Sequence, residues 1–110
     1  MAKSWIEKLN SDNPKHGIIK QCPDMWSNGG KLKTMLIPEP KKIDALVQSI
    51  QFGTVVTIGN LRSKLAKDAG ADMACPMTTG IFLKIVAFAA EEYREMGKDV
   101  TPYWRVVKDG

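Results

Sequence analysis

The chain is 110 residues long, with 44% hydrophobic and 25% charged residues, which predicts a single domain over residues 1–110 around one core. Its formal net charge of +4 favours a polyanionic partner. The sequence has two widely separated cysteines, one histidine and no apolar run long enough for a signal peptide or membrane span, so we expect no metal site, cofactor, disulfide or membrane partner, and a cytoplasmic protein.

Residues 1–33 are predicted to form an N-terminal extension of short elements and loops. Ser4 and Glu7 have the spacing of a capping box, which predicts a short helix to about Leu9. Glycines and prolines interrupt the apolar residues that follow. We therefore expect a loop to residue 33, with a brief extended piece over residues 17–20.

Apolar spacing predicts the next elements. Residues 34–37 are strand-like, and the apolar residues at 43, 46, 47 and 50 have the spacing of an amphipathic helix that begins near Pro40. The β-branched residues 54–56 predict a short strand. Thr57 is expected to cap the helix that follows, before a turn over residues 70–76.

A longer helix is predicted from Thr78 to Glu95 or Met96. Two helices joined by a short turn, after a first helix and a strand, have the order of a winged helix-turn-helix. The expected fold class is therefore α+β, as a small and mostly helical domain. Residues 104–108 would form the first strand of the wing, and Asp109 and Gly110 look like the start of a hairpin turn with no returning strand, so the wing is expected to be truncated.

The long helix has one apolar side, expected in the core, and an opposite side of small residues on which Lys84 is the only charge between Thr78 and Ala90. Small residues let a helix backbone approach a grooved surface closely, so we interpret this side as a DNA-reading surface. The alternative is a buried helix whose lysine reaches solvent. The residues expected to contact DNA are Arg62, Thr78, Thr79, Gly80, Lys84, Arg105 and Lys108.

Three stretches carry a family resemblance. Gly53–Leu61 reads GTVVTIGNL, Pro76 stands ahead of the long helix, and Pro102–Val106 reads PYWRV. Together they resemble the C-terminal DNA-binding domain of the alkylguanine-DNA alkyltransferases and the alkyltransferase-like proteins, over roughly residues 37–110. The resemblance implies a winged-helix protein of DNA repair that binds the minor groove and rotates a damaged guanine into a pocket.

The same resemblance implies that the chemistry is absent. The family's alkyl-accepting cysteine falls on Tyr103 and its activating histidine on Trp104. The arginine that enters the base stack falls on Gly80, and the tyrosine that helps to turn the nucleotide falls on Ile58. We therefore expect a non-enzymatic protein that binds duplex DNA. Tyr103 and Trp104 are expected at the former pocket, where their volume favours filling it as core.

Two alternatives use the same part of the chain. The first is a protein-interaction module, in which one helix face docks on a partner or on a second copy; that face comprises Gly80, Ile81, Lys84 and Phe88. The second is an alkyl acceptor that uses Cys75, because a thiol at a helix N-terminus can become nucleophilic.

Overall fold

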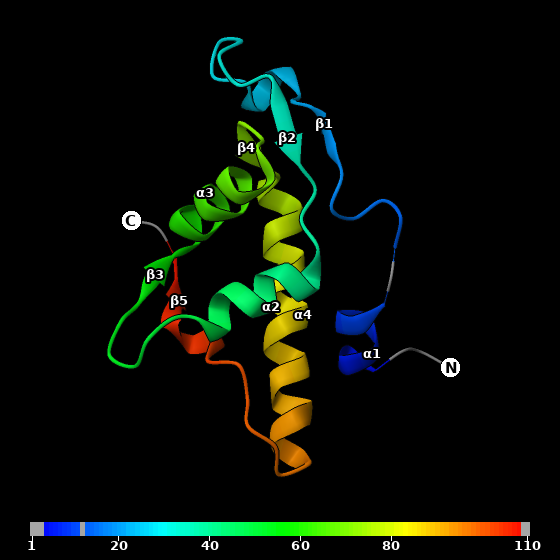
Figure 1. Cartoon of the computed structure of the whole chain (residues 1–110), viewed down its shortest axis with the longest axis vertical. Helices are drawn as coiled ribbons and strands as arrows, with labels where there is room; N and C mark the ends of the chain where they lie inside the picture. The colour runs from blue at the N-terminus through cyan, green and yellow to red at the C-terminus, as the bar shows by residue number, and fades with distance from the viewer. Residues whose placement is uncertain (1–3, 12, 109–110) are drawn as a thin grey trace.

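A long helix, α4, runs along the middle of the molecule, and the other elements pack around it (Figure 1). The structure is a computed structural model that describes residues 4–11 and 13–108. The elements in chain order are α1 (Trp5–Asn10), β1 (Ile19–Gln21), the 3-10 helix η1 (Asp24–Trp26), β2 (Thr34–Leu36), α2 (Pro40–Gln48), β3 (Val56–Thr57), α3 (Ile58–Ala69), β4 (Met73–Ala74), α4 (Pro76–Glu95), the 3-10 helix η2 (Tyr103–Arg105) and β5 (Val106–Val107).

Side-chain caps begin three of the helices. Ser4 Oγ accepts a backbone N–H of α1 at 3.1 Å, and Thr57 Oγ1 accepts one of α3 at 3.0 Å. Both caps are predicted by the sequence. Cys75 Sγ does the same for α4 at 3.4 Å. Each cap satisfies a backbone donor that has no partner inside its helix. Gly70 ends α3 in the left-handed region, with φ 76°.

The larger sheet has the strand order β1–β2–β4. β2 is antiparallel to β1 and parallel to β4, and Met35 lies opposite Met73 in the parallel pair. Because side chains alternate along a strand, Leu36 and Ala74 point to one face and join the main core. The opposite face carries a second, smaller apolar cluster.

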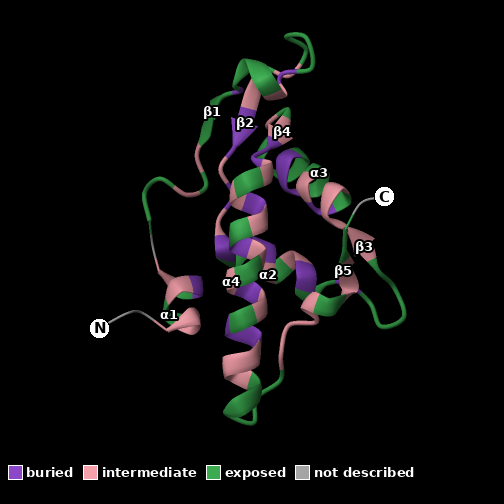
Figure 2. Ribbon diagram, turned by 180° about the vertical axis from the view of Figure 1, so that it is seen from behind, coloured by how far each residue is buried: buried purple, intermediate pink, exposed green. Residues whose placement is uncertain are grey.

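The main core is built between α2, α3 and α4, and Figure 2 shows buried and exposed positions alternating along α4. Burial of such apolar side chains is the main stabilising contribution to a domain of this size. The side chains with no exposed surface on α2 and α4 are Ile43, Val47, Thr79, Val86 and Ala89.

The N-terminal helix α1 packs on the side of α4. Leu9 is buried in the main core, and the ring of Trp5 stacks on Phe88 with 4.7 Å between ring centroids. The backbone N–H of Ile6 donates to Glu92 Oε1 at 2.8 Å. The predicted extension is therefore an integral part of the fold in its first helix.

The α+β, mostly helical class is confirmed, whereas two features differ from the expected winged helix-turn-helix. Residues 70–75, which join α3 to α4, contain β4, and this strand pairs with β2. The predicted strand over residues 104–108 starts as η2, and β5 then pairs in parallel with β3. The expected turn at Asp109 and Gly110 lies outside the described residues.

Candidate nucleic-acid interface

The outward face of the first half of α4 is apolar and carries one positive charge. Met77 and Ile81, which lie one turn apart, are 65% and 56% exposed, and Lys84 is also exposed. A Cβ built on Gly80 would meet nothing within 4 Å, so the backbone is accessible there. The first acidic residue of α4 is Glu91, in its second half. A flat or grooved anionic surface can therefore approach this face without meeting a carboxylate of α4.

The two threonines of the first turn differ in exposure. Thr79 is fully buried, and its hydroxyl donates to the carbonyl oxygen of Cys75 at 2.7 Å. It presents no side-chain surface to a ligand, which corrects the expectation that it lies near phosphates. Thr78 is half-buried, and its hydroxyl donates to Cys75 Sγ at 3.1 Å.

Basic residues of α3 line a cleft that leads to the start of α4. This cleft has a volume of about 620 Å³ and lies between α3 and the segment around η1. Arg62 and Lys67 come from α3, Trp26 and Leu32 from the opposite wall, and Pro76 from the first turn of α4. The structure thus brings Arg62 close to the beginning of the predicted DNA-reading helix.

Arg105 has a role in the fold that its sequence position does not predict. One of its terminal nitrogens donates to the carbonyl oxygen of Ile50 at 2.7 Å, and its guanidinium lies 5.6 Å from the ring centroid of Phe52. These contacts tie η2 to the segment after α2, so part of the predicted phosphate-binding capacity of Arg105 is used inside the molecule. Lys108 is exposed after β5.

Tyr103 and Trp104 contact each other edge to face, with 5.4 Å between ring centroids. Tyr103 is half-buried, but Trp104 is 50% exposed, and the guanidinium of Arg94 lies 5.8 Å from its ring centroid. The expectation that both rings fill a former pocket as core is therefore wrong for Trp104. Its exposure follows from the 3-10 turn, which directs consecutive side chains to different sides.

Both thiols are buried. Cys75 is 5% exposed and Cys22 is 4% exposed. Burial raises the pKa of the Cys22 thiol, and the nearby carboxylates of Asp72 and Asp24 raise it further. Little thiol surface is available for nucleophilic attack at either position. Among the described residues, no three His, Cys, Asp or Glu side chains lie close enough together to bind one metal ion.

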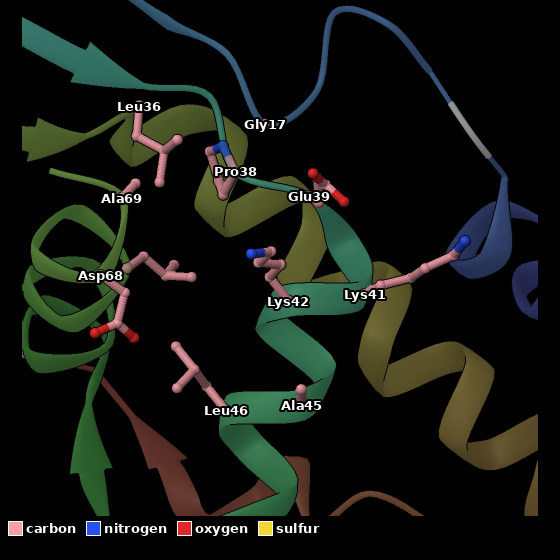
Figure 3. A pocket seen from close by; sticks show the side chains of 11 residues that line it. Gly17, Leu36, Pro38, Glu39, Lys41, Lys42, Ala45, Leu46, Asp68 and Ala69 are labelled. Carbon is pink, nitrogen blue, oxygen red and sulfur yellow. The ribbon is translucent and has the colours of Figure 1, made fainter. Parts of the chain in front are cut away.

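A second cavity, of about 470 Å³, opens between α2 and α3 (Figure 3). Leu36, Leu46 and Leu65 give it apolar walls, and the side chains of Lys42 and Asp68 extend from its two sides. It is lined by none of the residues that the sequence predicts to be functional. The candidate interface is therefore separate from this cavity.

No family model matches the chain, and neither a curated protein nor a solved structure matches it significantly. The family resemblance accordingly remains a prediction that depends on the quoted residues. Within the described ranges, we find no helix with the length and apolar character needed to cross a membrane.

Proposed function

We propose that this protein binds duplex DNA without catalysing a reaction, and that the first half of α4 lies in a groove of the duplex. The observation that carries this proposal is the exposed face formed by Met77, Gly80, Ile81 and Lys84. This face combines open space above the backbone with a positive charge and no carboxylate. A DNA groove is flanked by phosphates, which attract lysine and repel acidic side chains.

The arrangement of α3 supports the proposal. Arg62 and Lys67 lie along the cleft that ends at the first turn of α4, so both can reach phosphates beside the groove that α4 occupies. In this use, α3 and α4 act as the two helices of a helix-turn-helix, although a strand is included in their connection. Ile81 supplies the apolar side chain that minor-groove proteins insert between bases.

The absence of catalysis is supported by the residues at the position of the family's reactive pair. Tyr103 offers a phenol at the position where alkyl transfer needs a cysteine thiolate, which is a far stronger nucleophile. Cys75, the alternative acceptor, is 5% exposed, and its sulfur accepts the backbone N–H and the hydroxyl of Thr78. Its sulfur is thus engaged in capping a helix.

One observation favours the protein-interaction module as a second candidate. Met77, Ile81 and Phe88 form an exposed apolar line along α4, and Trp5 extends it through its stacking on Phe88. Exposed apolar patches often mark protein interfaces. Association through this line would depend weakly on salt, whereas binding to phosphates weakens linearly with the logarithm of salt concentration.

The test is a fluorescence anisotropy titration of a labelled duplex over a series of salt concentrations. Arg62→Ala and Lys84→Ala should each weaken binding to all sequences alike and reduce the salt slope by about one unit. Lys98→Ala is the matched control, because Lys98 is an exposed lysine just beyond the opposite end of α4. Parent-like affinity of the Arg62 and Lys84 variants at low salt would remove the proposed interface.

A further inference from the structure

The smaller apolar cluster is composed largely of sulfur-bearing side chains. It lies on the face of the β1–β2–β4 sheet that is turned away from the main core. Cys22, Met35 and Cys75 are buried in it, and Met73 packs against them. These residues include both cysteines of the chain. Such a concentration of soft sulfur atoms on one sheet face calls for a chemical explanation besides packing.

Strand register places three of these sulfur-bearing side chains on one face of the sheet. Met35 and Met73 are direct neighbours across β2 and β4, and neighbours in register share a face. Cys22 extends β1, because its backbone N–H donates to the carbonyl oxygen of Lys33 at 2.8 Å. Lys20 is opposite Met35, and residues two apart on a strand share a face, so Cys22 points to the same side.

The spacing of two of the sulfurs is close to that of metal ligands. The Cys22 thiol donates to Met73 Sδ at a sulfur–sulfur distance of 3.2 Å. Two sulfur ligands of a tetrahedral ion with metal–sulfur bonds of about 2.3 Å lie about 3.8 Å apart. An increase of about half an ångström in the distance between Cys22 Sγ and Met73 Sδ would therefore admit an ion between them. Methionine side chains are flexible enough for this adjustment.

We propose that Cys22, Met35 and Met73 form a binding site for monovalent copper. Thiolate and thioether sulfurs are soft ligands, and soft ligands select Cu(I) over harder cations. On binding, the Cys22 S–H bond breaks, a sulfur–copper bond forms, and the proton passes to solvent. Copper remains Cu(I), so the step needs no oxidant or reductant. Cys75 is excluded from the ligand set because its sulfur caps α4.

The ion has a path to this site. Met73, Trp26 and Leu32 all line the cleft of about 620 Å³ beside α3, and Trp26 and Leu32 also pack against the sulfur cluster. An ion that enters the cleft meets the Met73 thioether before it reaches Cys22, which is 4% exposed. The surrounding apolar side chains would then limit the access of water to the bound metal.

The test titrates the reduced, metal-free, whole protein with Cu(I) under anaerobic conditions against a chromophoric chelator, and follows isotope-labelled methionine methyl groups by NMR. We expect one Cu(I) per chain and shifts of the Met35 and Met73 methyl resonances. Met25, Met77 and Met96 are internal controls, because they lie outside the cluster and are 79%, 65% and 58% exposed. Shifts confined to these exposed methionines, or none, would overturn the proposal.

Variants identify the ligands. Cys22→Ser and Met73→Leu should each weaken Cu(I) binding by at least about tenfold. Cys75→Ser is the matched control: serine is a good N-cap, so α4 stays capped and the affinity should be unchanged. Thermal denaturation of the metal-free variants reports folding. If Cys22→Ser unfolds, the nearly isosteric Met73→Leu decides, and parent-like affinity of that variant would show that the cluster serves only packing.

Discussion

Replacement of Gly80 by alanine separates the stability of α4 from its proposed contact with DNA. Gly80 lies inside the helix Pro76–Glu95, where glycine costs about 0.5–1 kcal/mol relative to alanine. A Cβ at this position would meet nothing within 4 Å, so the free protein gains helix propensity without a steric clash. The free energy of unfolding should rise by about 0.5–1 kcal/mol, which raises Tm by roughly 2–6 °C for a domain of this size.

On DNA, the same methyl group would stand between the backbone of α4 and the groove. We expect Gly80→Ala to lose about 1 kcal/mol of binding free energy, which is roughly a fivefold loss of affinity. Thermal denaturation measures the gain in stability, and anisotropy titration of the same preparation measures the loss of affinity. A variant that is more stable than the parent and binds duplex DNA equally well would refute the close approach of this helix face.

The remaining predictions concern stability. Trp104→Ala should lower the free energy of unfolding by less than about 2 kcal/mol because the ring is half exposed, whereas Phe82→Ala in the core should cost about 3–5 kcal/mol; similar costs in chemical denaturation would contradict the placement of Trp104. Thr57→Ala should cost about 1 kcal/mol by removing the cap of α3. The backbone N–H groups of Lys33 and Thr34, at the start of β2, donate to the Asp72 carboxylate and hold its pKa below the ordinary value of 3.8. These hydrogen bonds stabilise the folded state while the carboxylate is ionised. This stabilisation is present above about pH 4 and is lost as the pH falls through the lowered pKa, so Asp72→Asn should lose less stability than the parent on acidification.

The helices follow from local signals, whereas the strand pairings do not. The cap at Thr57 and the apolar spacing over residues 43–50 place α3 and α2 within a few residues of their observed bounds. β4 is not predictable from its own residues, because Met73 and Ala74 become a strand only through pairing with distant β2. β3 is different, because the β-branched residues 54–56 predict a strand near its position, but its parallel pairing with β5 is not predictable from those residues.

In the candidate interface, too, features set by local sequence signals are predictable, and features set by long-range contacts are not. Helical periodicity alone predicts that Gly80 and Lys84 face away from the core. The same periodicity places Thr79 on the core side with Phe82 and Val86, so its burial is also predictable from the sequence. The expectation of a phosphate contact rested instead on the general preference of helix N-termini for phosphates. The sulfur cluster depends on register: Cys22 and Met73 are far apart in sequence, and β2 lies between their strands.

The most direct measurement of DNA binding by α4 follows the backbone amide resonances of the isotope-labelled protein while a short duplex is added at low salt. The proposed interface predicts that the largest shifts occur in residues 76–84 and at Arg62 and Lys67, and that they weaken as salt is raised. The segment 97–101, beyond the opposite end of α4, should remain unchanged (Figure 1). An unperturbed spectrum at low salt, or shifts confined to residues 97–101, would contradict DNA binding through the first half of α4.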